Sequence, residues 1–267
     1  MIIPRKLDPG SPVISLRLFG SMARTDADAN SDLDILVVLS SSEGFNLDSL
    51  KRNVERLFDS IASLSVYSQK RMAELFRQGH LFAWHIYLES LPITMEEFSD
   101  WVEGLGRPAY YSAARKDIES LVAILKSIGP SVMACPRNRI YEAGLMYVCL
   151  RNIALCASWH SPRGLDFSRQ SPFAIEQATG VSFPISSNDY AALTACRMSG
   201  QRGAAGKDIE LEKLLSLWRK ATEWSNEITN FVGEARDERG FKTPQISPAD
   251  RARTRSINSS KLVINHG

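Results

Sequence analysis

The chain has 267 residues, enough to bury one large hydrophobic core or two modest ones, and its composition is that of an ordinary globular protein. The formal net charge of +2 excludes a strongly acidic or strongly basic chain, but the charge is unevenly divided. Residues 1–107 carry 11 basic and 15 acidic side chains, whereas residues 108–267 carry 21 and 15. An acidic metal-binding half and a basic half facing a nucleotide would give this imbalance, and so would chance.

Cysteine usage and the N-terminal sequence bear on the compartment. The four cysteines show no Cys-x-x-Cys spacing, so a zinc site is not expected; they are Cys135, Cys149, Cys156 and Cys196. Free thiols in apolar patterns are typical of a reducing compartment. The N-terminus lacks the apolar core of a signal peptide, and no uninterrupted apolar run approaches membrane-spanning length. We therefore expect a cytoplasmic protein with no membrane partner.

The first hundred residues alternate short strands with amphipathic helices. A polar segment that begins with one helical turn follows the first strand, over residues 21–30. Alternating or continuously aliphatic runs predict strands over residues 13–19, 35–39, 63–68 and 91–93. Apolar residues at helical spacing predict helices over residues 47–61, 69–78 and 81–90.

Strand signals fade after residue 108, and helical spacing dominates. The predicted helices cover residues 110–128, 139–159, 173–179, 188–198 and 208–232. A Gly-rich basic stretch, residues 199–206, predicts a loop, and the sequence from residue 234 onward is poor in apolar residues. The predicted fold class is therefore α+β: a domain with a mixed β-sheet over residues 1–107, a helical bundle over 108–233 and a disordered tail over 234–267.

One stretch carries the chemistry, from the end of the first strand to the start of the second. Gly20-Ser21 closes the first strand, and Asp32-Leu33-Asp34 opens the second. Because strand side chains alternate between faces, Asp32 and Asp34 point the same way while Leu33 points into the core. Two adjacent carboxylates repel each other unless a cation lies between them, and hard oxygen ligands favour magnesium. A Gly-Ser turn can offer N–H groups and a hydroxyl to phosphate.

This pattern resembles the DNA-polymerase-β-like nucleotidyltransferase superfamily, and within it the small bacterial nucleotidyltransferase-domain proteins, antibiotic nucleotidyltransferases and antitoxins among them. The resemblance covers about the first hundred residues. It implies that Asp32 and Asp34 are the catalytic residues and ligate two Mg²⁺ ions. It further implies that Gly20 and Ser21 hold the phosphates of ATP or another nucleoside triphosphate, and that Arg24 adds positive charge against them.

The sequence departs from the family at its third carboxylate, which the family carries on a later strand. That strand is predicted over residues 63–68, and Ser65 stands where the acid is expected. Other acidic candidates are Glu89, Asp59 in the preceding helix, and the loop residues Asp26 and Asp28, for which a surface role is favoured. A serine coordinates a metal but is a poor base, so the departure bears on whether catalysis is retained.

The predicted function is metal-dependent transfer of a nucleoside monophosphate, AMP from ATP, to a hydroxyl of a protein, a small molecule or an RNA end, with release of pyrophosphate. One alternative is an antitoxin-type protein that binds or adenylylates a partner toxin. Another is a degenerate, non-catalytic nucleotide-binding module. Arg151 and His160 are spaced too far apart for the ribonuclease signature of HEPN domains, and His80 and His85 are interpreted as structural. The acceptor, the preferred base and the oligomeric state are not encoded in any motif.

Overall fold

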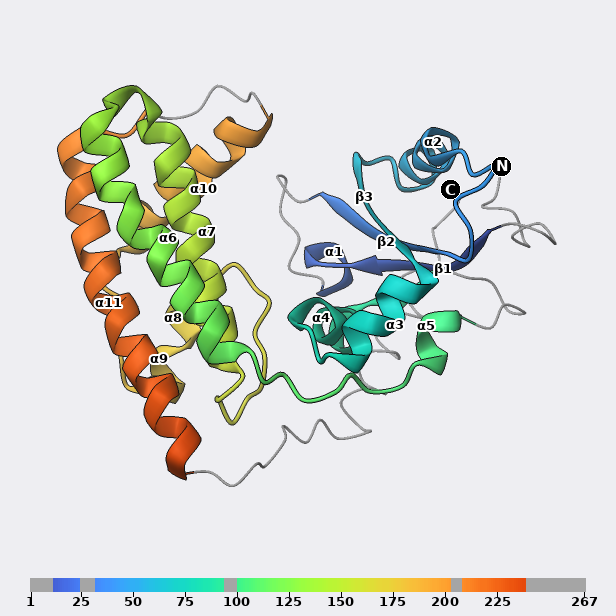
Figure 1. Cartoon of the computed structure of the whole chain (residues 1–267). Helices are drawn as coiled ribbons and strands as arrows, with labels where there is room; N and C mark the ends of the chain where they lie inside the picture. The colour runs from blue at the N-terminus through green and yellow to red at the C-terminus, as the bar shows by residue number, and fades with distance from the viewer. Residues whose placement is uncertain (1–11, 25–31, 94–99, 203–207, 239–267) are drawn as a thin grey trace, which may run out of the picture. The chain divides into compact units, whose positions relative to one another are not determined.

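The computed structural model describes residues 12–24, 32–93, 100–202 and 208–238, and these residues form two compact units that divide between Tyr111 and Ser112. The first unit is built on a small β-sheet, and the second is helical (Figure 1). This architecture confirms the predicted α+β class, with its mixed sheet followed by a helical region.

The sheet of the first unit has four strands in the order β3-β2-β1-β4. They are β1 (Val13–Phe19), β2 (Leu33–Leu39), β3 (Ala62–Ser68) and β4 (Leu91–Pro92). Strand β1 is antiparallel to both β2 and β4, whereas β3 is parallel to β2. The parallel pair needs a crossover, which α2 (Leu47–Phe58) supplies. The sheet is therefore mixed, and β2 with β1 forms its centre.

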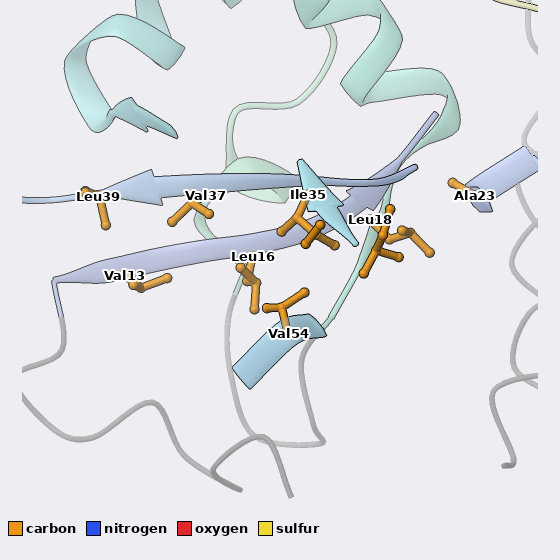
Figure 2. Packing of buried hydrophobic residues seen from close by; sticks show 10 residues of the cluster. Val13, Leu16, Leu18, Ala23, Ile35, Val37, Leu39 and Val54 are labelled. Atoms are coloured by element: carbon orange, nitrogen blue, oxygen red, sulfur yellow. The ribbon is translucent and has the colours of Figure 1, made fainter. Parts of the chain in front are cut away.

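One face of the sheet packs on α2 and on α1 (Ser21–Arg24). Figure 2 shows its core, in which side chains of β1 and β2 such as Leu16 and Ile35 lie on the side of the sheet that faces Val54 of α2. Leu33, Ile35 and Val37 are fully buried here, and burial of such a side chain is worth about 1.5–3 kcal/mol. This packing fixes the register of β2, because a one-residue slip would bring Asp34 into the core beneath α2.

The opposite face carries a second core beneath three helices. They are α3 (Gln69–Arg77), α4 (Leu81–Glu89) and α5 (Trp101–Gly104). Phe19, Leu36 and Val38 of the sheet pack here against side chains such as Met72 and Ile86. Asp34 belongs to this face, because it precedes Leu36 by two residues on the same strand.

A buried polar network ties α5 to this second face. Asp100, the N-cap of α5, accepts hydrogen bonds from the Ser15 hydroxyl and the Arg17 guanidinium of β1. Arg17 also donates from Nε to the Ser90 hydroxyl at 2.7 Å and from Nη2 to the Ser90 carbonyl at 3.1 Å. Helix α5 was not predicted, because its four residues lie in a segment whose glycines and proline indicate a junction.

The second unit is a helical bundle with a central apolar helix. Its elements are α6 (Ala114–Ala134), the 3-10 helix η1 (Pro136–Asn138), α7 (Arg139–Ser158), α8 (Ser171–Ala174), α9 (Glu176–Thr179), α10 (Ser187–Arg202) and α11 (Leu211–Glu238). Residues 136–158 are long and apolar enough to cross a membrane, but 67% of the most apolar window is buried within the structure, as in the core helix of a bundle.

Several predicted element bounds differ from those found. Helix α6 begins four residues later than predicted and continues through Pro130 to Ala134. The predicted loop at residue 199 is wrong at its start, because α10 continues to Arg202; residues 203–207 lie outside the described residues. Helix α11 likewise takes in the first five residues of the predicted tail, and residues 239–267 are also outside the description.

Candidate active site

Gly20 forms the turn that ends β1, and it lies directly against Asp34. Its φ of +76° is in the left-handed region, which side chains other than hydrogen disfavour. A Cβ placed on Gly20 would lie 2.5 Å from Oδ2 of Asp34, closer than real Cβ contacts come. The turn continues into α1, whose first bonds run from the N–H groups of Ala23 and Arg24 to the Gly20 carbonyl at 3.2 Å each. Glycine is therefore favoured at this position for two reasons: the positive φ, and the lack of space for a side chain beside Asp34.

The two aspartates lie at the N-terminal end of β2. Asp32 directly precedes the strand, Asp34 is its second residue, and both are half-buried. Leu33 between them is fully buried in the core with α2, so the aspartates share the other face. Asp34 is the register partner of Phe19 on β1 and of Ser63 on β3. The predicted alternation is confirmed for Leu33 and Asp34, the first two residues of β2.

The parallel register of β2 and β3 places a serine beside Asp34. Ser63, not Ser65, is the partner of Asp34, and Ser65 pairs with Leu36. Ser63 is exposed and shares the face of Asp34, because paired residues of parallel strands point to the same side. Strand β3 was correctly predicted, but its alignment with β2 depends on how the α2 crossover packs, and the spacing of apolar residues does not predict that.

A third metal-binding side chain is not found within the described part of the chain. No three His, Cys, Asp or Glu residues there are grouped so that they could hold a metal ion. Asp26 and Asp28 lie outside the described residues. Asp59 caps the C-terminus of α2 with a φ of 47°.

Arg24 and Glu89 form an ion pair between α1 and the end of α4. Nη1 of Arg24 lies 2.8 Å from Oε2 of Glu89, and each side chain is only 17% exposed. The same carboxylate oxygen lies 3.1 Å from Nε2 of His85, one turn earlier on α4. Sequence analysis named Glu89 only as one acidic candidate among several, and it predicted that Arg24 adds positive charge against the phosphates. No sequence signal joins the two residues, because they lie 65 positions apart in the chain.

His80 and His85 of the first unit have structural contacts. His80 is the N-cap of α4 and accepts the Phe82 N–H at Nδ1 over 3.1 Å. The ring of His85 packs edge-on against Phe19, with ring centroids 5.4 Å apart. Both contacts agree with the structural interpretation of these residues.

Comparison with known proteins identifies the first unit. Residues 3–84, which include Gly20, Ser21, Asp32 and Asp34, match the family model of the nucleotidyltransferase domain. These residues therefore match a nucleotidyltransferase domain. The predicted resemblance is thereby confirmed for this part of the chain, and the turn and the two aspartates lie inside the matched region of the nucleotidyltransferase domain.

Two solved structures are similar to this chain, but at low sequence identity and low TM-score. The structure of spectinomycin adenyltransferase AAD(9) from Enterococcus faecialis with ATP and spectinomycin is 13% identical, with a TM-score of 0.44 over 82% of this chain and 92% of that chain. A nucleotidyltransferase-like protein from Exiguobacterium sibiricum 255-15 is 10% identical, with a TM-score of 0.31 over 94% of this chain and 84% of that chain. No curated protein gives a significant match. Both TM-scores lie below 0.5, so the identification depends on the family model.

Proposed function

We propose that this chain transfers a nucleoside monophosphate, AMP from ATP, to a hydroxyl of a protein, a small molecule or an RNA end, and releases pyrophosphate. The observation that carries the proposal is the close approach of Gly20 to Asp34. It leaves no room for a side chain between the turn and the carboxylate. A turn of this kind brings backbone N–H groups to a phosphate, and the adjacent carboxylates supply ligands for the cation that accompanies it.

The donor set fits one divalent ion that arrives with the nucleotide. Mg²⁺ in phosphate-binding sites commonly takes one or two protein carboxylates and fills its other positions with phosphate oxygens and water. Asp32 and Asp34 match that requirement in number, chemistry and shared face. The expected second ion finds no further acidic ligand grouped with them in the described residues. Such an ion, when bound, neutralises phosphate charge and polarises the phosphorus–oxygen bonds.

Each residue of the site has a task in this proposal. Gly20 and Ser21 bind phosphate oxygens through the turn amides and the Ser21 hydroxyl, and Arg24 adds positive charge. Asp32 and Asp34 would hold the cation that accompanies the triphosphate, which would help to place the α-phosphorus in line with the acceptor oxygen. The acceptor oxygen forms a bond to that phosphorus, the bond to pyrophosphate breaks, and the hydroxyl proton passes to a carboxylate of the pair or to water. No covalent enzyme intermediate is required.

A non-catalytic nucleotide-binding module is the second candidate, and Ser63 favours it. The residue beside Asp34 on β3 is a serine, whose hydroxyl is a weak base and a weaker metal ligand than a carboxylate. In this case the site would still bind a magnesium nucleotide but would not turn it over.

Binding and turnover measured together test both candidates. Full-length chain would be titrated with Mg-ATP by calorimetry and assayed for pyrophosphate with candidate acceptors. D32N and D34N are expected to weaken Mg-ATP binding at least about tenfold. Loss of a residue that only hydrogen-bonds to a metal ligand already costs about tenfold in affinity, and loss of a ligand itself should cost at least as much. D48N, which changes an exposed aspartate of α2, is the matched control.

Three results separate the candidates. Binding that depends on Asp32 and Asp34 together with pyrophosphate release supports the transferase. The same binding without release for any acceptor supports the binding module. Binding that is unchanged in D32N and D34N refutes the site.

A further inference from the structure

Arg24 is fixed by a carboxylate from a distant part of the sequence. Arg24 and Glu89 are 65 residues apart in the chain, yet Nη1 of Arg24 lies 2.8 Å from Oε2 of Glu89, and each side chain is 17% exposed. The Arg115–Glu119 pair of α6 has the same length, but its side chains are 53% and 50% exposed. Ion pairs as exposed as the second contribute little, whereas a part-buried pair is less screened by solvent and holds its geometry more firmly.

Glu89 also connects the turn to the strand that carries the aspartates. Its Oε2 accepts a hydrogen bond from Nη1 of Arg24 on α1 and lies 3.1 Å from Nε2 of His85 on α4. His85 packs edge-on against Phe19, the register partner of Asp34. One carboxylate oxygen therefore links the last residue of the Gly20–Arg24 turn to the part of the sheet on which Asp34 lies.

We propose that Glu89 is a positioning residue for nucleotide binding: it orients the Arg24 guanidinium toward the phosphates of the bound triphosphate. A guanidinium is planar, so fixing one of its nitrogens fixes the direction of its remaining N–H groups. Glu89 is the last residue of α4 and so is held by that helix, which packs on the sheet through Ile86 and Ala83. This inference rests on the proposed function, because it assigns Glu89 a task at the same phosphate site.

A charge-reversal experiment separates positioning from simple support of the fold. E89Q keeps the shape of the side chain and removes its charge, and it is expected to weaken Mg-ATP binding about tenfold, the size of one lost charge-assisted hydrogen bond. The double variant R24E/E89R restores an ion pair with the charges exchanged. It is expected to recover much of the thermal stability lost in R24E alone, but to bind Mg-ATP no better than E89Q, because the positive charge has moved off the turn.

Controls make failure of this inference distinct from failure of the proposed function. E119Q, in the exposed pair of α6, should leave both the melting temperature and the affinity unchanged. If R24E/E89R regains both stability and affinity, Glu89 supports only the fold and the proposal is overturned. Wild-type affinity in E89Q, with weak binding in D32N and D34N, also overturns the role of Glu89 and leaves the proposed function intact. Wild-type affinity in all three variants refutes the proposed function as well.

Discussion

Replacing Gly20 by alanine tests the close approach on which the site depends. Two costs add at this position. The φ of +76° disfavours any L side chain by about 1 kcal/mol. A Cβ only 2.5 Å from Asp34 Oδ2 must in addition displace that carboxylate or the β1–β2 pairing, and forced repacking of this kind costs about 1–3 kcal/mol.

Gly44 provides a matched control for G20A. Its φ of +67° is similar, but a Cβ there would meet nothing within 4 Å. G44A therefore has the backbone cost alone, and the difference between the two variants measures the close approach. We expect G20A to lower the free energy of unfolding by about 1–3 kcal/mol more than G44A does. We also expect Mg-ATP binding to weaken at least about tenfold in G20A and to stay unchanged in G44A, because a shift of 1.4 kcal/mol is a factor of ten.

Urea unfolding and calorimetric titration of the two variants give both quantities. Equal unfolding free energies would show that the Gly20 turn has room for a side chain. Wild-type affinity in a folded G20A would show that the nucleotide does not use this turn. Either result would show that the close approach of Gly20 to Asp34 does not form the proposed phosphate site.

Two further predictions concern buried groups away from the turn. D100N should lower the free energy of unfolding by about 3–5 kcal/mol in urea, because it leaves the Arg17 guanidinium, 7% exposed, without its carboxylate; a loss below about 1 kcal/mol would contradict this. Burial, and secondarily the charge of Glu142, raises the pKa of Cys149 to about 12, so its thiolate is scarce at pH 8. Iodoacetamide at that pH should label Cys135, which is only partly buried, before Cys149, as read by mass spectrometry; equal rates in the native protein would argue against the buried position of Cys149.

Most strands and helices of the first unit could be predicted because the spacing of their apolar residues along the chain reflects which face of each element is buried. Alternation predicted β1 with its observed bounds, and helical spacing predicted α3 and α4 to within one residue. The Asp32–Leu33–Asp34 alternation also held, because the period of a strand does not depend on its partners. The weaker predictions were at ends, such as those of α6 and α10, where tertiary packing extends a helix beyond its sequence signals.

Contacts between segments that are distant in the sequence could not be predicted from the spacing of apolar residues. The pairing of Arg24 with Glu89 joins residues 65 positions apart, and the Ser15–Arg17–Asp100 network spans more than 80. Neither follows from a local pattern, because each depends on how α4 and α5 cover the sheet. The same holds for Ser63, whose place beside Asp34 is set by the β2–β3 register.

The amino-acid sequence predicted the fold class and the components of the proposed phosphate and carboxylate site: Gly20, Ser21, Asp32 and Asp34. Residue type and strand period are enough for that, because they decide which side chains share a face. Three contacts are seen only in the folded structure: Gly20 lies against Asp34, Ser63 is the register partner of Asp34, and Glu89 forms an ion pair with Arg24. These are long-range contacts, and their distances are set by helices packed on a sheet rather than by spacing along the chain.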